Sequence, residues 1–257
     1  MKVLAEKGYR VIAPDQRGYS PNARPTFIKE YSLKHTSSDV LAIANAYNLQ
    51  RFHLVGHDWG SSVGWAFVAE HPERLYSWTS LSIPHMKAFQ EAYRSDFDQQ
   101  RRSKYIKFFN MPFFPELYFS YKGYNNLKNI WSAHDDEEKE AYLSVFRQSG
   151  ALRSALNWYR ANIGRHRNPT DHINFGIVEV PSLLVWGNMD MAIGRKSIVL
   201  NKQYMAGPYN LLELYAGHWL IQESFEDVSK AIIKPVSYTH LRAHETRHDL
   251  VCRLLLE

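Results

Sequence analysis

Cysteine is almost absent from this chain: Cys252 is the only one among 257 residues. A single cysteine cannot form an internal disulfide, and the paired spacings that hold structural zinc or serve redox chemistry are missing. The sequence therefore excludes a disulfide-stapled scaffold and a cysteine-based zinc fold. A reducing compartment fits this composition, and we expect a cytoplasmic protein.

Long hydrophobic runs and blocks of one charge are also absent. No apolar run approaches the roughly 18 residues that cross a bilayer, and residues 1–7 carry too many charges for the apolar core of a signal peptide. The 31 Lys and Arg residues outnumber the 26 acidic ones, which gives a net charge of +5, but they form no long basic run. We therefore expect neither a membrane nor a nucleic acid as a partner.

What is present is a regular alternation of β-favouring runs and helical patterns over the first 84 residues. Short apolar runs that end near Gly or Pro predict strands, and apolar residues at helical spacing between them predict helices. We expect strands at 9–13, 51–55 and 75–83 and helices at 37–47 and 61–70. Ser37 and Ser38 are the expected caps of the first helix. Such alternation predicts a parallel sheet with helices on both faces.

The alternation breaks after Pro84. Residues 85–172 are rich in aromatic and charged side chains, and their pattern predicts helices without a convincing strand. We expect helices at 135–148 and 151–163 and then strands at 181–186 and 209–215. The resulting domain prediction is a first core segment at 1–84, a helical cap at 85–172, a second core segment at 173–235 and a tail at 236–257.

A candidate nucleophile follows the second expected strand. Gly56, His57, Asp58, Trp59 and Gly60 form the turn from this strand to the next helix, which is the layout of a nucleophile elbow. Glycines two residues before and after the aspartate leave room where side chains would collide in so tight a turn. The backbone N–H of Trp59, at the start of the helix, is the expected donor to a developing oxyanion.

An aspartate at this position indicates ester chemistry at saturated carbon. A carboxylate can form an alkyl ester, which a second step with water must hydrolyse. His218, after the last expected strand, is the candidate general base, and Asp190, after the previous strand, is the candidate that orients its imidazole. Alone, Asp58 could form an Asx-turn and His218 could be a loop histidine. Their joint order, nucleophile, acid and histidine at strand ends, is that of the α/β-hydrolases and favours a triad.

Five short motifs lie at or between these residues along the chain. They are Gly18-Tyr19-Ser20, His57-Asp58-Trp59-Gly60, Ser82-Ile83-Pro84-His85, Asn157-Trp158-Tyr159-Arg160 and Gly217-His218-Trp219. With them the chain resembles the soluble epoxide hydrolases of the α/β-hydrolase superfamily over about residues 1–235. The resemblance implies an α/β-hydrolase fold with a helical cap. It also implies two cap tyrosines that hydrogen-bond the epoxide oxygen while the aspartate attacks the ring carbon.

The two tyrosines that the resemblance implies are Tyr159 and Tyr105. The family motif Asn-Trp-Tyr-Arg is matched fully around Tyr159. Residues 105–113 resemble the pattern Tyr-x-x-x-Phe-Gln-x-Pro-Gly, with Asn110 for Gln and Phe113 for Gly. A phenol suits this role because a pKa of about 10 lets it stabilise or protonate an alkoxide. An insertion rich in tyrosine would also present some of them to a cleft without a catalytic role.

These expectations combine into the hydrolysis of a small apolar epoxide to a vicinal diol, with no metal or organic cofactor. The expected catalytic residues are Asp58, Asp190, His218, Tyr105 and Tyr159. A haloalkane dehalogenase shares the aspartate nucleophile and remains the alternative enzyme, although it needs halide-binding N–H donors in place of paired phenols. A non-catalytic fold fragment or small-molecule binding protein is the alternative from another class. The sequence leaves the substrate's stereochemistry and the oligomeric state open.

The resemblance also implies parts that this sequence lacks. The family begins with further strands and a His-Gly-x-Pro loop that supplies a second oxyanion N–H, and no His-Gly-x-Pro occurs here. We therefore expect the first strands of the sheet to be missing and a sheet edge to be uncovered. We also expect weak turnover, since loss of one oxyanion donor costs about a hundredfold or more in other hydrolases.

The tail at 236–257 departs from the closing helix of the family and resembles translated adaptor sequence. It contains a formal HExxH pattern at His244, Glu245 and His248, which on a helix would place two histidines on one face. No third zinc ligand accompanies this pattern. We therefore expect no metal site.

Overall fold

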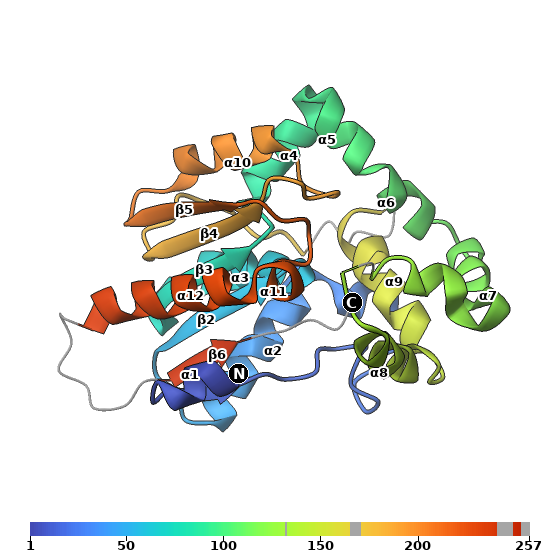
Figure 1. Cartoon of the computed structure of the whole chain (residues 1–257), viewed down its shortest axis with the longest axis horizontal. Helices are drawn as coiled ribbons and strands as arrows, with labels where there is room; N and C mark the ends of the chain where they lie inside the picture. Colours follow the sequence, from blue (N-terminus) through green and yellow to red (C-terminus); the bar gives the residue numbers. More distant parts are fainter. Residues whose placement is uncertain (132, 165–170, 241–248, 253–257) are drawn as a thin grey trace. The chain divides into compact units, whose positions relative to one another are not determined.

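The computed structural model describes residues 1–131, 133–164, 171–240 and 249–252, and for 234–240 and 249–252 it describes the backbone alone. The chain folds into two compact units. The first contains Met1–Pro14, Ser37–Arg102 and the described residues from Ile173 onward, and the second contains Asp15–Thr36 and Ser103–His172. Figure 1 traces the elements of each unit in chain order.

A parallel sheet forms the centre of the first unit. Its strands are β1 (Arg10–Ile12), β2 (Phe52–His57), β3 (Leu75–Leu81), β4 (Ser182–Gly187), β5 (Tyr209–Leu214) and β6 (Asp249–Cys252). They lie in the order β1-β6-β2-β3-β4-β5, and every neighbouring pair is parallel. The carboxyl ends of β2, β4 and β5 therefore point to the same edge of the sheet, where loops of such folds carry ligand sites.

Helices cover both faces of this sheet, as the sequence predicts. The helices that lie mostly in the first unit are α1 (Lys2–Glu6), α2 (Leu33–Ala46), α3 (Trp59–Glu70), α4 (Met86–Ser95), α5 (Phe97–Arg102), α10 (Arg195–Asn201), α11 (Leu220–Glu223) and α12 (Phe225–His240). On one face, α1, α11 and α12 pack against Val55, Leu81 and Val185 of the sheet. On the other face, Trp65 of α3 contacts Trp78 of β3, with 5.5 Å between ring centroids.

Strands β2 and β4 are buried along their whole length, which explains their composition. Every residue of β2 and of β4 is buried. Strands covered by helices on both faces read as nearly continuous apolar runs because neither face meets water. Each large apolar side chain buried here contributes about 1.5–3 kcal/mol to folding. The strands therefore form a rigid frame for the loops at their ends.

Helix α2 begins earlier than the sequence predicts, at Leu33 rather than near Ser37. Ser37 and Ser38 lie inside the helix, so the expected capping is wrong. The backbone N–H of Leu33 donates instead to Asn162 Oδ1 at 2.8 Å. This acceptor lies 129 residues away in the sequence, so no local pattern could reveal it.

Strand β6 comes from the segment that the sequence assigns to a tail. It lies between β1 and β2 and is parallel to both, with Leu250 paired to Val11 on one side and to His53 on the other. The sequence does not predict this strand, because its partners are far away along the chain. Strands β1 and β5 form the two edges of the sheet.

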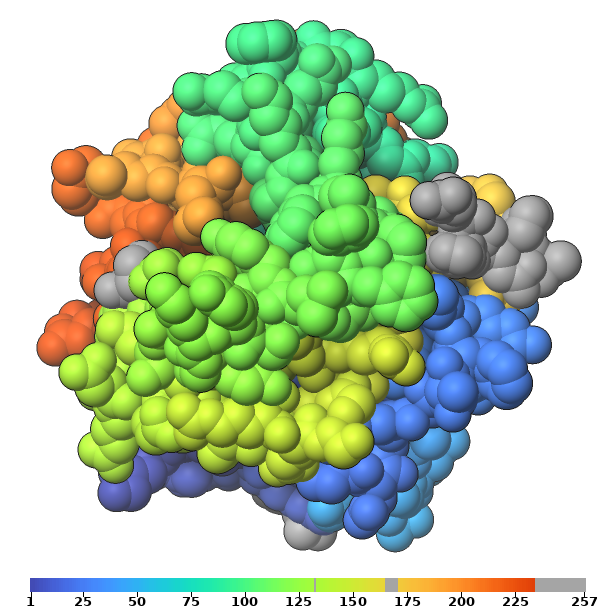
Figure 2. Space-filling view, turned by 90° about the vertical axis from the view of Figure 1, so that its right-hand side faces the viewer, coloured from blue at the N-terminus to red at the C-terminus, as the bar shows by residue number. Residues whose placement is uncertain are grey.

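The second unit is helical. Its elements are η1 (Ile28–Tyr31), α6 (Lys104–Phe109), α7 (Phe114–Lys128), α8 (Asp136–Phe146) and α9 (Ala151–Asn162), and none of its described residues forms a strand. Helices α6 to α9 form the green to yellow surface in Figure 2. As predicted, a helix follows Asp135, whose carboxylate accepts the N–H of Glu138 at 2.8 Å. In the described part of the whole chain, no helix is long and apolar enough to cross a membrane.

Residues 15–36 pack onto α9 within this unit. Trp158 Nε1 donates to the carbonyl of Arg17 at 3.0 Å, and the hydroxyls of Tyr31 and Ser154 lie 2.8 Å apart. Two segments therefore group differently in space than along the chain, since 15–36 belongs to the second unit and 85–102 to the first. The domain boundaries drawn from the sequence remain a prediction.

Candidate active site

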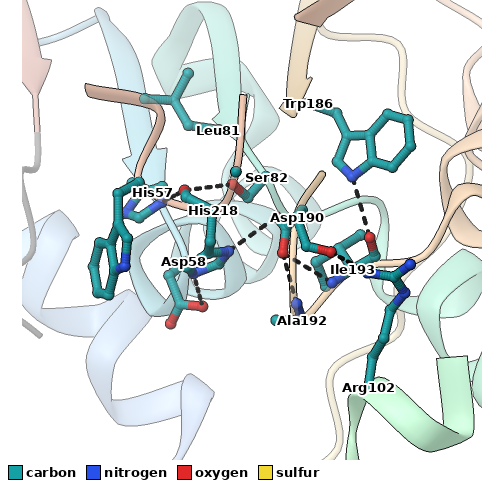
Figure 3. A network of polar contacts seen from close by, with 12 residues as sticks. His57, Asp58, Leu81, Ser82, Arg102, Trp186, Asp190, Ala192, Ile193 and His218 are labelled. Carbon is teal, nitrogen blue, oxygen red and sulfur yellow. Dashed lines mark hydrogen bonds and ion pairs between the residues drawn. The ribbon is translucent and has the colours of Figure 1, made fainter. Parts of the chain in front are cut away.

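A strained turn joins β2 to α3 and carries Asp58 (Figure 3). The φ of 45° and ψ of −116° at Asp58 lie outside the regions that side chains normally allow. The turn is also tight, because a Cβ on Gly56 would lie 2.4 Å from the carbonyl oxygen of Gly60. Only glycine fits at position 56. This is the geometry of the elbow expected from the sequence.

The carboxylate of Asp58 is buried, and both of its oxygens have partners. Oδ1 accepts the backbone N–H of Trp59 at 2.6 Å, and Oδ2 lies 3.1 Å from His218 Nε2. The carboxylate also lies at the N-terminal end of α3, where the helix dipole favours negative charge. These contacts fix the orientation of the carboxylate and hold its Oδ2 next to the imidazole of His218.

On its other side, the imidazole of His218 meets Asp190. His218 Nδ1 lies 2.9 Å from Asp190 Oδ2. Asp190 is fully buried, and its Oδ1 accepts the backbone N–H groups of Ala192 and Ile193 at 2.7 and 3.0 Å. Since an ionised carboxylate only accepts, Nδ1 carries a proton and Nε2 is the nitrogen that faces Asp58. The structure thus brings together Asp58, His218 and Asp190 at the ends of β2, β5 and β4.

Two opposing effects act on the pKa of His218. Burial lowers this pKa, but the charges and hydrogen bonds of Asp190 and Asp58 outweigh burial and raise the pKa well above its ordinary value of 6.5. The protonated imidazole can donate to both carboxylates at once, whereas the neutral ring can donate to only one. His218 is therefore held in its charged form as long as both carboxylates are ionised.

The backbone of His218 is held by two further polar side chains (Figure 3). His57 Nε2 donates to the carbonyl of His218 at 2.9 Å, and Ser82 Oγ donates to the same oxygen at 3.2 Å. Burial, together with the nearby charge of His218, lowers the pKa of His57 to about 4, so this ring is neutral at ordinary pH. Ser82 adopts a φ of 70°, a region that serine rarely occupies.

The two candidate tyrosines lie together in the second unit. Tyr105 of α6 and Tyr159 of α9 make an edge contact, with 6.0 Å between ring centroids and 80° between ring planes. Phe109 packs against both, at 5.2 Å from Tyr105 and 4.8 Å from Tyr159. Such T-shaped contacts place the positive edge of one ring on the negative face of another. The two tyrosines that the resemblance implies are therefore neighbours in the structure.

Buried Arg160 fixes the helix that carries Tyr159. Its guanidinium donates to both oxygens of Glu116, at 2.7 and 2.9 Å, and to the carbonyl of Met111 at 2.8 Å. A bidentate Arg–carboxylate pair has a fixed planar geometry. Arg160 therefore ties α9 to α7 and to the turn after α6.

Sequence reasoning missed four side chains that contact this network: His57, Ser82, Gln99 and Arg102. The first two lie inside the quoted motifs, so their positions carried a signal that was not assigned a role. The other two lie in a polar run on α5 that looks like a solvated surface. Among the described residues, no group of three His, Cys, Asp or Glu side chains could hold a metal ion. The HExxH residues His244, Glu245 and His248 lie outside the described part of the chain.

Comparison with known proteins agrees with this architecture. The family model described as "alpha/beta hydrolase fold" matches residues 1–224. Epoxide hydrolase 4 of Homo sapiens is 32% identical over 94% of this chain and 67% of its own length. The AB hydrolase superfamily protein YfhM of Bacillus subtilis is 29% identical over 91% of this chain and 82% of its own length.

A solved structure has the same fold. Epoxide hydrolase A of Mycobacterium thermoresistibile superposes with a TM-score of 0.73 at 24% identity, over 92% of this chain and 85% of its own. At that identity the likeness establishes the fold. The parallel sheet, the elbow after β2 and the match over most of the sequence lead to one conclusion: this chain is a hydrolase that belongs to the α/β-hydrolase fold family.

Proposed function

We propose that this chain hydrolyses an epoxide to a vicinal diol through an ester on Asp58. The observation that carries the proposal is a carboxylate at the tip of the nucleophile elbow, with His218 Nε2 3.1 Å from its Oδ2. A hydroxyl at this position would serve acyl transfer, whereas a carboxylate serves displacement at saturated carbon. Relatives named epoxide hydrolase support an epoxide as the substrate.

In the first step, an oxygen of Asp58 attacks a carbon of the epoxide ring. The new C–O bond forms as the ring C–O bond breaks, and the electron pair passes to the ring oxygen. Tyr105 and Tyr159 hold that oxygen, and one of the two phenols donates its proton to it. The products of this step are an alkyl ester on Asp58 and a free hydroxyl on the adjacent carbon.

In the second step, water hydrolyses the ester. His218 takes a proton from water as the water oxygen attacks Cγ of Asp58, and Asp190 stabilises the imidazolium that forms. The tetrahedral oxyanion accepts from the N–H of Trp59. When it collapses, the bond from Cγ to the substrate oxygen breaks, the second water proton passes to that oxygen, and the diol leaves. The carboxylate of Asp58 and the charged imidazole of His218 are then restored.

The pKa of His218 links the two steps. In the free enzyme, both carboxylates raise this pKa against the effect of burial, so the imidazole is charged. Esterification removes the charge of Asp58, and the pKa of His218 then falls. His218 then releases its proton, which restores the phenol that protonated the ring oxygen, and the base is neutral at the stage that needs it. Ester formation itself prepares the second step.

One experiment tests the proposal directly. In the His218→Gln variant, water activation is lost while Asp58 can still attack, so the ester should accumulate. Incubation with styrene oxide should add the mass of one epoxide to the intact protein, and peptide mapping should locate it on Asp58. The double variant Asp58→Asn with His218→Gln is the matched control and should stay unmodified.

The outcomes separate the alternatives. Chloride release from a chloroalkane, without diol formation from epoxides, would favour a dehalogenase. Absence of any adduct with either substrate would favour a non-catalytic protein. Turnover of the unmodified chain tests a further expectation. The sequence has no His-Gly-x-Pro loop to supply a second oxyanion donor beside the N–H of Trp59, so we expect slow hydrolysis. A turnover number above about 10 s⁻¹, the median for enzymes, would contradict that expectation.

A further inference from the structure

The loop at 190–194, which presents Asp190, is held by a buried glutamine from another part of the chain. Gln99 of α5 is fully buried. Its Oε1 accepts the N–H of Gly194 at 2.8 Å, and its Nε2 donates to the carbonyl of Ala192 at 2.8 Å. The amide thus pairs with the loop backbone at both ends, much as a neighbouring strand would.

One peptide group connects Gln99 to the carboxylate of Asp190. The peptide between Ala192 and Ile193 accepts the Gln99 amide at its carbonyl and donates its N–H to Asp190 Oδ1 at 3.0 Å. A peptide group is planar and rigid, so fixing its oxygen also fixes the direction of its N–H. Hydrogen bonds in such a chain also polarise one another. Gln99 therefore sets the orientation of a donor that Asp190 depends on.

Arg102 holds the same loop at its other end. Its Nη1 donates to the backbone carbonyl of Asp190 (Figure 3), and its Nε donates to Asp98 Oδ2 at 2.7 Å, which keeps the guanidinium in place. The helix and the loop approach closely: a Cβ on Gly194 would lie 3.2 Å from Asp98 Oδ2 and 3.3 Å from Gln99 Oε1. Glycine at 194 permits this approach.

We infer that Gln99 and Arg102 are positioning residues that hold the 190–194 loop so that Asp190 stays aligned with Nδ1 of His218. The inference rests on the proposed function for its kinetic consequence. It assigns to α5, which the sequence places in the cap, a role at the acid of the triad. Neither residue touches the reacting atoms, so each acts through Asp190.

The helix supplies a matched control for each residue. Gln100 is the exposed neighbour of Gln99, and its side chain donates to the Arg94 carbonyl within the same segment. Arg101 is the exposed neighbour of Arg102 and donates to Asp98 alone. Methionine matches glutamine in length, replaces the aliphatic stem of arginine, and removes the hydrogen bonds of both. The variants Gln99→Met and Arg102→Met are therefore compared with Gln100→Met and Arg101→Met.

Two measurements separate positioning from simple structural support. Single-turnover kinetics with styrene oxide give the rates of ester formation and ester hydrolysis separately. In Gln99→Met we expect ester hydrolysis to slow about tenfold to a hundredfold, with ester formation nearly unchanged, because misalignment of about 1 Å has such effects on one step. Arg102→Met should show the same selective loss. The side chain of Arg102 is partly exposed, so we expect Arg102→Met to fold even if Gln99→Met does not.

The second measurement does not depend on activity. A titration of histidine-labelled protein by NMR, assigned with His218→Gln, gives the pKa of His218. Gln99→Met and Arg102→Met should lower the pKa of His218, because an Asp190 carboxylate that is displaced from the imidazole raises this pKa less. Unchanged His218 titration and unchanged hydrolysis in both variants, with reduced thermal stability, would overturn the inference and leave a structural role. If the parent chain forms no ester, the proposed function fails, while the titration still decides the positioning role.

Discussion

The candidate acid, base and nucleophile of the first unit are joined to one another by hydrogen bonds, whereas the candidate tyrosines of the second unit meet each other through a ring contact. Asp190 is fully buried and accepts from two backbone N–H groups and His218. Tyr105 and Tyr159 are half-buried and pack edge to face. Hydrogen bonds weaken steeply with misalignment, while ring contacts tolerate a range of geometries. The polar network should therefore be far more sensitive to small changes.

The largest expected effect is that of Asp190→Asn. The amide can present its NH₂ to Nδ1 of His218, which favours the wrong tautomer, and it no longer stabilises the imidazolium. By analogy with the same change in a serine-protease triad, kcat should fall by about 10⁴. Rapid-quench kinetics should show that the ester on Asp58 accumulates. The exposed Asp227→Asn on α12 is the control, and equal rates in both variants would contradict the triad.

The next effect concerns the stability of the second unit. Glu116→Gln leaves the buried guanidinium of Arg160 without its charged partner, and we expect the free energy of unfolding to fall by about 3 kcal/mol. Urea denaturation measures this change. Glu213→Gln removes the partner of Arg195 at an exposed ion pair and should change stability little. Similar losses in both variants would show that the buried pair has no special weight.

A smaller effect is expected at the tyrosines. Tyr159→Phe and Tyr105→Phe keep the ring contact and remove the hydroxyl, so the unit should fold normally. Each should slow ester formation by about a hundredfold, as loss of one oxyanion donor does elsewhere, and should leave ester hydrolysis nearly unchanged. Tyr118→Phe, on the exposed surface of α7, is the control. If the variants instead slow ester hydrolysis, the proposed role of the phenols in ester formation is wrong.

The smallest effect is a pH dependence at His85 in the first unit. Burial, together with the charge of Lys87, lowers the pKa of His85 to about 4. Between pH 6.5 and 4 the unfolded chain binds this proton and the folded chain does not, so stability falls as the pH falls. His85→Asn keeps a capping acceptor for the N–H of Lys87 and removes the titration. From pH 7 to 5, the variant should therefore lose about 2 kcal/mol less stability than the parent.

Chemical denaturation at the two pH values measures the prediction at His85. Gln90→Asn, at an exposed and non-titratable position of α4, provides a comparison in which the pH dependence should match that of the parent. If His85→Asn has the same pH dependence as the parent, the ring is not the group whose protonation weakens the fold.

Much of the first unit could be predicted because its signals are local. Strands β2 to β5 and helix α3 follow from apolar runs between Gly and Pro residues. Asp58, Asp190 and His218 could be named together because each follows a strand, and the carboxyl ends of parallel strands converge. In the second unit, the residue pattern of 135–148 and 151–163 likewise predicts helices α8 and α9.

Features that depend on distant partners could not be predicted. The start of α2 depends on Asn162, strand β6 depends on pairing with β1 and β2, and the loop at 190–194 depends on Gln99. No pattern distinguishes Gln99 from Gln100, although one is buried and the other exposed. The difference arises when α5 meets the loop.

The sequence alone determined the fold class, the order of the strands along the chain and the chemical identity of the candidate nucleophile, base and acid, because those depend on periodicity and on residue type. Only the tertiary structure decided which side chains hold them: His57 and Ser82 on the His218 carbonyl, and Gln99 and Arg102 on the Asp190 loop. The physical reason is that a hydrogen bond depends on distance and direction in space. Separation along the chain carries no information about either.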